Sequence, residues 1–184
     1  MNTIIYFENE ERPFQYNIRI LREIRRHYPQ TPITVISAGD FSSTGSLLVP
    51  SCKERSESLI EAGADLVLSL PAASVLGGYG KKEFAGTALI QKLHASEKVV
   101  IPCVPAPGQS PKDCGSALRA LAMHIFRANS EYCRRQKEYT GMKMAYRDAQ
   151  ARAVCDCLPE ADRLLSFPEN RYALWQHNTM LELY

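Results

Sequence analysis

The stretch from Arg55 to Pro71, RSESLIEAGADLVLSLP, constrains the fold of this chain more than any other part of the sequence. Ser51 and Glu54 stand just before it in the S-x-x-E spacing of a capping box, which predicts a helix that begins there and ends at Gly63. The residues Asp65 to Leu70 are almost all apolar, which is typical of a strand covered on both faces in a parallel sheet. A helix followed directly by such a strand indicates an α/β fold.

Other short apolar runs repeat this alternation along the chain. Thr3 to Phe7 and Ile33 to Ile36 predict two buried strands, and between them Pro13 begins a helix with apolar residues at helical spacing. Lys98 to Val104 predicts a fourth strand, after a helix over Lys82 to Leu93. This order predicts a Rossmann-like, doubly wound parallel sheet, a fold that binds ligands at the carboxyl ends of its strands.

The strand pattern ends after Pro105 to Pro111, a Pro- and Gly-rich linker or lid. From Ser116 onward the apolar residues recur at helical spacing, and Ser166 with Glu169 forms a second S-x-x-E box before the last helix. We therefore expect an α/β core over residues 1–110 and a helical extension over residues 111–184, packed on the core.

Composition bounds the function only loosely. A formal net charge of +2 is too small to argue for nucleic acid or an anionic membrane, and no apolar run approaches the length of a membrane span. The chain has six cysteines but no signal-peptide pattern at its start, so we expect reduced thiols and a cytoplasmic location. Cys155 and Cys157 are interpreted as structural residues, because a C-x-C pair on a helix points to different sides.

Several motifs resemble those of one family. They are Gly39-Asp40-Phe41, Gly45, Arg55, LIEAGADLVLSLP from Leu59 to Pro71, Phe84-Ala85 with Ala88-Leu89, Tyr132 to Gly141, and Pro168-Glu169-Asn170. In this order they resemble the N-terminal part of the tRNA(Met) cytidine acetate ligases, which belong to the HxGH nucleotidyltransferase-like superfamily. Family members are about twice as long, and the region that they use for tRNA has no counterpart here, so the resemblance does not extend to tRNA binding.

The resemblance implies a site in which ATP, accompanied by Mg²⁺, lies over the carboxyl ends of the first and fourth strands. The residues that match the family's nucleotide-binding positions are Pro13, Phe14, Gly39, Asp40, Phe41, Gly45, Arg55 and Asn170. For three of them another interpretation stays open. Arg55 could pair with Glu54, Glu57 or Glu11 on the surface, Gly45 could be a turn residue, and Asn170 could cap its helix.

The family's H-x-G-H motif is missing from this chain. Pro13-Phe14 is followed by Gln15-Tyr16-Asn17-Ile18, so both histidines and the glycine that admits the phosphates are replaced. We therefore expect a pseudoenzyme that keeps the fold and has lost or weakened adenylyl transfer. Glu8, Glu10 and Glu11, beside the start of the same helix, are expected to repel a triphosphate bound between the loops 7–14 and 39–45.

Two other functions remain open. A divergent active nucleotidyltransferase would need new phosphate contacts, which Lys53, Arg55, Lys81 and Lys82 could supply. A non-catalytic module could form a homodimer through apolar residues of the last helices, Trp175, Met180 and Leu181. The basic residues between Arg134 and Arg152 are interpreted as a solvated helix face in preference to an RNA footprint, because acidic residues are interleaved with them.

Overall fold

The computed structural model describes residues 2–76, 81–92, 96–126 and 130–181. The chain divides into two compact units, Met1–Val100 and Ile101–Tyr184. The first unit contains every strand of the described chain, and the second contains helices and loops.

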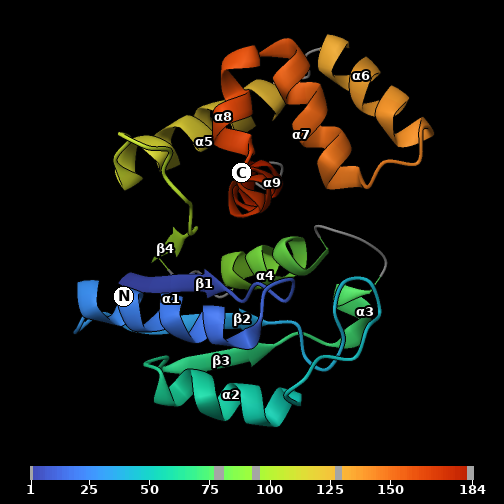
Figure 1. Ribbon diagram of the computed structural model, residues 1–184. Coiled ribbons are helices and arrows are strands. Elements are labelled where there is room, and N and C mark those ends of the chain that lie inside the picture. The colour runs from blue at the N-terminus through green and yellow to red at the C-terminus, as the bar shows by residue number, and fades with distance from the viewer. Residues whose placement is uncertain (1, 77–80, 93–95, 127–129, 182–184) are drawn as a thin grey trace. The chain divides into compact units, whose positions relative to one another are not determined.

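The first unit is built on a four-stranded sheet in the order β3-β2-β1-β4 (Figure 1). Each neighbouring pair of strands is parallel. The elements are β1 (Asn2–Phe7), α1 (Phe14–His27), β2 (Ile33–Ser37), α2 (Cys52–Glu61), β3 (Leu66–Ser69), α3 (Ala72–Val75), α4 (Lys81–Lys92) and β4 (Ser96–Val100). This strand order and the intervening helices confirm the predicted Rossmann-like sheet.

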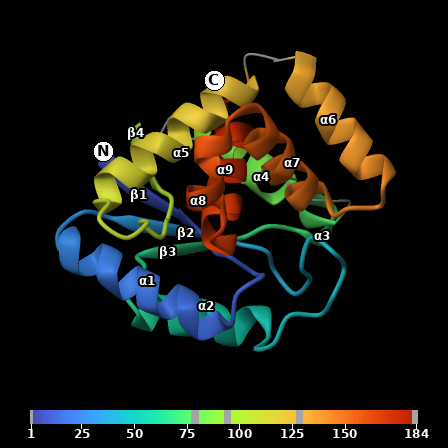
Figure 2. The same ribbon diagram turned by 45° about the horizontal axis from the view of Figure 1, so that its top comes forward.

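Helices cover both faces of this sheet. On one face, Leu21 of α1 and Leu59 of α2 pack with Ile4 and Val35 of the strands in one buried cluster, and α1 and α2 lie next to one another (Figure 2). On the other face α4 approaches so closely that a Cβ atom added to Gly86 would lie 2.6 Å from Cε1 of Phe7. Alternate residues of β1 therefore point to different helices, as the doubly wound arrangement requires.

The step from α2 to β3 follows the sequence closely. Ser51 and Glu54 form the predicted capping box, and Gly63 has φ +120°, which favours glycine. The expectation that the following strand is covered on both faces is wrong, because Leu66 is 46% exposed. The reason is that β3 is an edge strand, with β2 as its neighbour on one side.

Two other boundaries differ from the predicted ones. The fourth strand ends at Val100 and not at Val104, since Val104 is hydrogen-bonded to Asn170 of the second unit instead of to a strand. The run of small residues from Pro71 to Gly80 predicts a loop in which Gly77 and Gly78 are turn residues. Its beginning forms the short helix α3 instead, and the two glycines lie outside the described residues.

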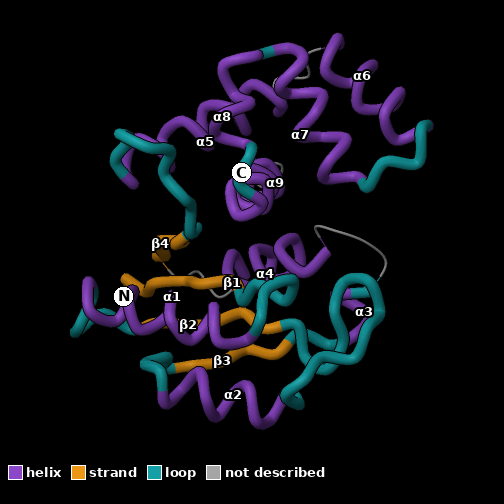
Figure 3. The backbone as a smooth tube through the Cα atoms, viewed as in Figure 1, coloured by secondary structure: helices purple, strands orange, loops and turns teal. Residues whose placement is uncertain are grey.

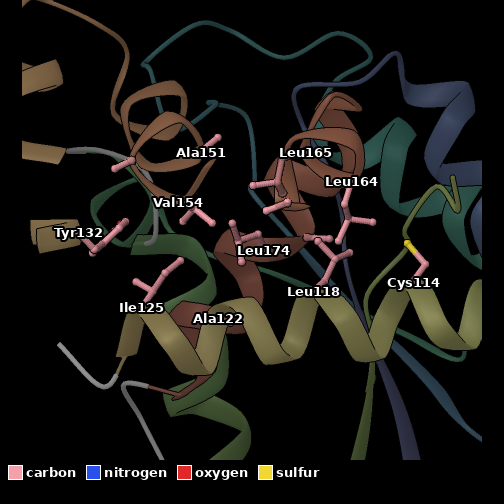
Figure 4. Close-up of a cluster of buried hydrophobic side chains, with 13 residues drawn as sticks. Cys114, Leu118, Ala122, Ile125, Tyr132, Ala151, Val154, Leu164, Leu165 and Leu174 are labelled. Carbon is pink, nitrogen blue, oxygen red and sulfur yellow. The ribbon is translucent and has the colours of Figure 1, made fainter. Parts of the chain in front are cut away.

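The second unit is helical in its described parts, as predicted for the extension. It contains α5 (Pro111–Phe126), α6 (Ser130–Gly141), α7 (Tyr146–Cys157), a 3₁₀ helix (Pro159–Ala161), α8 (Asp162–Leu165) and α9 (Pro168–Leu181). Leu118, Ala122, Leu165 and Leu174 are among the buried residues of its core (Figure 4). No helix in the described part of the chain is long and apolar enough to cross a membrane.

The start of α5 is set by a capping pair that the sequence analysis missed. The Ser110 hydroxyl accepts a hydrogen bond from the backbone N–H of Asp113 at 3.1 Å and donates to its carboxylate at 2.6 Å, so α5 begins at Pro111 and not at Ser116. The second predicted box is wrong. The Ser166 hydroxyl donates to the carbonyl oxygen of Arg163 at 2.8 Å, because Ser166 ends α8 instead of beginning α9.

Candidate functional site

The candidate site lies where β1 and β2 end, and the loop after β2 is its largest part (Figure 3). This loop turns back on itself, with Phe41 and Leu47 paired in an antiparallel bridge. The backbone N–H of Gly45 donates to the carbonyl oxygen of Ser42 at 3.0 Å, and Gly45 has φ +85°. Gly45 is therefore a turn residue. The bridge fixes the backbone of Phe41, which is 38% exposed.

Gly39 and Asp40 fix the beginning of the loop. Gly39 has φ +70°, and a Cβ atom there would lie 2.9 Å from the carbonyl oxygen of Leu70, so a larger residue does not fit. The Asp40 carboxylate accepts a hydrogen bond from the backbone N–H of Cys52 at 2.9 Å, at the first residue of α2. Asp40 thus caps α2 and holds the loop against it.

Arg55 is the centre of the site. It lies on α2, it is 2% exposed, and its Nε donates to Oε1 of Glu8 at 3.1 Å. Its Nη1 donates to the carbonyl oxygen of Pro50 at 2.9 Å, and its Nη2 donates to that of Gly39. Since Glu8 follows β1 and Gly39 follows β2, Arg55 joins the ends of the two strands.

This position excludes the alternative that was left open, a surface pairing of Arg55 with Glu54, Glu57 or Glu11. The guanidinium enters the buried end of the sheet, where Glu8, itself 2% exposed, is its counter-ion. The second carboxylate oxygen of Glu8 accepts a hydrogen bond from the Ser37 hydroxyl at 2.6 Å. A buried pair of this kind needs further hydrogen bonds to offset the loss of water, and both partners have them.

Lys82 makes a second buried ion pair at the same end of the sheet. Its side chain is 1% exposed, and its Nζ donates to the carboxylate of Glu10 and to the backbone carbonyl oxygen of Glu8. Burial alone would lower the pKa of Lys82, but the carboxylates of Glu10 and Glu83 outweigh it and raise the pKa. Lys82 therefore stays charged, and its charge is balanced within the protein.

These pairs change the expected roles of the carboxylates after β1. Glu8 and Glu10 were expected to lie at the start of α1 and to repel a triphosphate. Instead, Glu8 pairs with Arg55 and Glu10 pairs with Lys82, because a buried cation is costly unless a carboxylate neutralises it. Of the other two proposed cations, Lys81 is exposed, and Lys53 has an 85% exposed side chain 3.9 Å from the carboxylate of Glu57.

Two of the four residues that replace the H-x-G-H motif, Asn17 and Ile18, are buried, whereas Gln15 is exposed and Tyr16 is partly buried. Pro13 is the N-cap residue and Phe14 the first helical residue. Asn17 is 1% exposed: its Oδ1 accepts from the Tyr6 hydroxyl at 2.7 Å and from the Asn9 N–H at 2.8 Å. Ile18 is 6% exposed and belongs to the core cluster with the strands.

Asn17 is a positioning residue that the sequence analysis missed. Its Nδ2 also donates to the Asn9 carbonyl oxygen at 3.0 Å, so one amide side chain holds both backbone groups of Asn9. The signal was its place in the apolar stripe of α1, three residues after Phe14, where a polar side chain has to find buried partners.

Asn170 belongs to the helical unit, and the residues described above belong to the first unit. It is fully buried: its Oδ1 accepts from the Val104 N–H at 2.7 Å, and its Nδ2 donates to the carbonyl oxygens of Val104 and Leu164 at 2.8 and 2.9 Å. Both groups of its amide are thus bonded to backbone. Asn170 ties the segment 101–110 to α9, and its predicted nucleotide contact remains a prediction.

The helical unit has a cavity of about 190 Å³, lined in part by Asp148, Arg152, Asp162 and Arg171. The expected site residues do not line it, and Arg171 donates to the Asp148 carboxylate at 2.8 Å. Among the described residues, no group of three or more histidine, cysteine or acidic side chains is placed to hold a metal ion.

Two other surfaces were named from the sequence, the basic helix face and the apolar residues of the last helix. Arg134 and Arg135 both bond to the carboxylate of Glu131, at 2.7 and 2.8 Å, which lowers the pKa of Glu131 to about 2. This pairing supports a solvated helix face. Trp175 is 5% exposed, and its ring lies 5.9 Å from that of Tyr172 on the same helix, so the expectation that it forms an uncovered apolar surface is wrong. Met180 and Leu181, which were named with it, are partly buried.

No protein-family model and no curated protein matches the chain. Two solved structures are similar to it: TmcAL from Thermotoga maritima bound with α-thio ATP, with a TM-score of 0.74 and 16% identity, and apo TmcAL from the same organism, with 0.72 and 15%. Both matches cover 99% of this chain, and they cover 44% and 42% of those chains.

At this identity the likeness concerns the fold. TmcAL is a tRNA(Met) cytidine acetate ligase, so the structural neighbours are those that the sequence motifs predicted. The chain spans less than half the length of either TmcAL chain.

Proposed function

We propose that this protein binds a nucleotide at the carboxyl ends of β1 and β2 and has lost adenylyl transfer. The observation that carries the proposal is the first turn of α1. The positions that follow Pro13-Phe14 hold no imidazole, and the side chains of Asn17 and Ile18 are buried in the fold. The likeness to a TmcAL structure bound with an ATP analogue supports the nucleotide part of the proposal.

The loss of transfer follows from where positive charge is available. Attack on a nucleotidyl phosphate needs donors or cations aimed at the charge that develops in the transition state. Arg55 and Lys82 are each paired with a buried carboxylate of the same chain, so neither is free to meet a phosphate without breaking a buried pair. This pairing argues against a divergent active nucleotidyltransferase that uses these two residues.

Binding in this proposal depends on the loops themselves. The loop after β2 leaves the Phe41 ring 38% exposed, and the N–H groups at the start of α1 carry partial positive charge. Mg²⁺ would enter with the phosphates, since Mg²⁺ is usually held by one or two carboxylates together with phosphate oxygens and water.

Titration calorimetry with ATP and Mg²⁺, run beside a pyrophosphate-release assay, tests both parts. We expect measurable binding without pyrophosphate release. Gly39→Ala should abolish the binding, because the new Cβ meets the Leu70 carbonyl oxygen at 2.9 Å and φ is +70°. Gly115→Ala is the matched control, since a Cβ there has nothing within 4 Å.

Each part can fail separately. Pyrophosphate release at enzyme-like rates would overturn the loss of transfer and leave binding intact. No heat of binding at millimolar ATP, with folded wild-type protein, would overturn the nucleotide site.

A further inference from the structure

Two cysteines of the helical unit, Cys103 and Cys114, lie close together: the sulfur of each contacts a backbone carbonyl group near the other cysteine. The Cys103 Sγ lies 3.8 Å from the carbonyl oxygen of Pro111, one turn before Cys114 on α5. The Cys114 Sγ lies 3.4 Å from the carbonyl oxygen of Val104, the residue after Cys103. These reciprocal contacts place both sulfurs in the same space between the segment 101–110 and the first turns of α5, and Figure 4 shows the Cys114 sulfur turned toward that segment.

The two thiols also differ in access. Cys114 is 0% exposed, whereas Cys103 is half-buried and reaches solvent. Burial first, and then a hydrogen bond with the Cys103 side chain, raise the pKa of the Cys114 thiol to about 12. Direct interaction of the thiols agrees with the geometry of the two backbone contacts.

We propose that Cys103 and Cys114 are a modification site, a dithiol that a peroxide oxidises reversibly to a disulfide. The Cys103 thiolate attacks hydrogen peroxide: an S–O bond forms, the O–O bond breaks, and the departing hydroxide takes up a proton to leave as water, giving a sulfenic acid. The Cys114 sulfur then attacks the Cys103 sulfur while its own proton is transferred to the leaving hydroxyl. The S–S bond forms, the S–O bond breaks, and a second water leaves.

The division of roles follows from burial. An accessible thiol meets the oxidant first, and a buried thiol with a raised pKa resists peroxide on its own. Cys114 therefore acts only once Cys103 is oxidised beside it. The backbone next to Cys103 is already held, because Asn170 bonds both the N–H and the carbonyl oxygen of Val104 at 2.7 and 2.8 Å. Little chain entropy remains to be lost when the bridge closes.

The other cysteines lack this arrangement. Cys155 and Cys157 stand two positions apart on α7 and so point to different sides of it. The Cys52 Sγ donates to the Ser69 hydroxyl at 3.1 Å, in the first unit. Cys133 is half-buried on α6 and serves as the control in the helical unit.

Peptide mapping of the full chain tests the proposal. The reduced protein is treated with hydrogen peroxide, its remaining thiols are alkylated, and it is digested with trypsin without reductant. Lys112 lies between the two cysteines, so trypsin places Cys103 in the peptide 99–112 and Cys114 in the peptide 113–119. Only a disulfide then joins the two peptides.

We expect the joined peptide to appear while two of the six thiols are lost, and dithiothreitol to restore both. Cys103→Ser should abolish the joined peptide, and so should either Cys114→Ser or Cys114→Ala in whichever variant folds, whereas Cys133→Ser should leave its yield unchanged. Accumulation of Cys103 sulfinic acid without the joined peptide would overturn the proposal. A bridge that formed first between other cysteines would overturn it as well.

Discussion

Replacing Arg55 by methionine should destabilise the α/β unit by about 3 to 5 kcal/mol, because the Glu8 carboxylate is then left buried without its cation. Both side chains are 2% exposed, and their charged atoms are 3.1 Å apart. Two unit charges about 4 Å apart attract by about 4 kcal/mol at an effective dielectric constant of 20, so the pair is strong once it is formed. Methionine also removes the donors to the carbonyl oxygens of Pro50 and Gly39.

A double-mutant cycle separates the ion pair from these other losses. Glu8→Gln keeps an acceptor for the Ser37 hydroxyl, which donates to Glu8 at 2.6 Å, but removes the charge that faces Arg55. The double variant Glu8→Gln with Arg55→Met should be more stable than the sum of the single changes predicts, by about 2 kcal/mol or more. Arg26→Met is the matched control, because Arg26 and Glu23 form an exposed pair, worth less than about 1 kcal/mol.

Urea unfolding at pH 7 measures these differences, and hydrogen exchange of the β1 and β2 amides assigns them to the α/β unit. If Arg55→Met cost no more than Arg26→Met, or if the cycle were additive, the guanidinium would not be committed to Glu8. Arg55 would then be available for a phosphate, and the argument for lost transfer would fail with it.

Three further changes test other parts of the structure. Burial lowers the pKa of His177 to about 4, so the folded protein binds fewer protons than the unfolded chain between about pH 6.5 and 4. Between pH 7 and 4.5 the free energy of unfolding of the wild type, measured with urea, should therefore fall by about 2 kcal/mol more than that of His177→Gln. Asn170→Leu should cost about 2 to 4 kcal/mol in the same assay, because it leaves buried backbone groups unpaired. Glu10→Gln should destabilise the protein by about 1 to 3 kcal/mol, since it leaves the buried charge of Lys82 without its nearest anion. Glu11→Gln, at an exposed position, should change stability by less than about 0.5 kcal/mol. Calorimetry should show no gain in ATP affinity from either substitution.

Local sequence signals were enough to predict the sheet and the helices α1, α2 and α4, but not the short helix α3. The capping box at Ser51, the apolar run after Gly63 and the proline before α1 act within a few residues, and each produced the expected element. The exposure of Leu66 was not predictable in this way, because whether a strand is central or at an edge depends on the order of the whole sheet.

Motifs in the sequence named residues at the end of the sheet, but they did not indicate the partners of those residues. Arg55 and Glu8 are 47 positions apart, and an arginine on a helix gives no local sign that it will be buried. Asn170 and Val104 are 66 positions apart, and their pairing depends on how α9 packs within its unit. Asn17 is different, because its place in an apolar stripe was visible in the sequence and implied a buried hydrogen-bond partner.

At the carboxyl end of the sheet, carboxylates of the chain itself neutralise the buried cations. Arg55 and Lys82 would suit a phosphate site by charge and by position, yet Glu8 and Glu10 already balance them inside the protein. A buried cation is stable only when an anion lies next to it. In this protein a carboxylate of the same chain is that anion, so the cations need no phosphate as a counter-ion. The start of α1 also has no histidine that would favour a phosphate. In the proposed function, a nucleotide is recognised by the backbone of the loop from Gly39 to Gly45, and its affinity should vary little with salt.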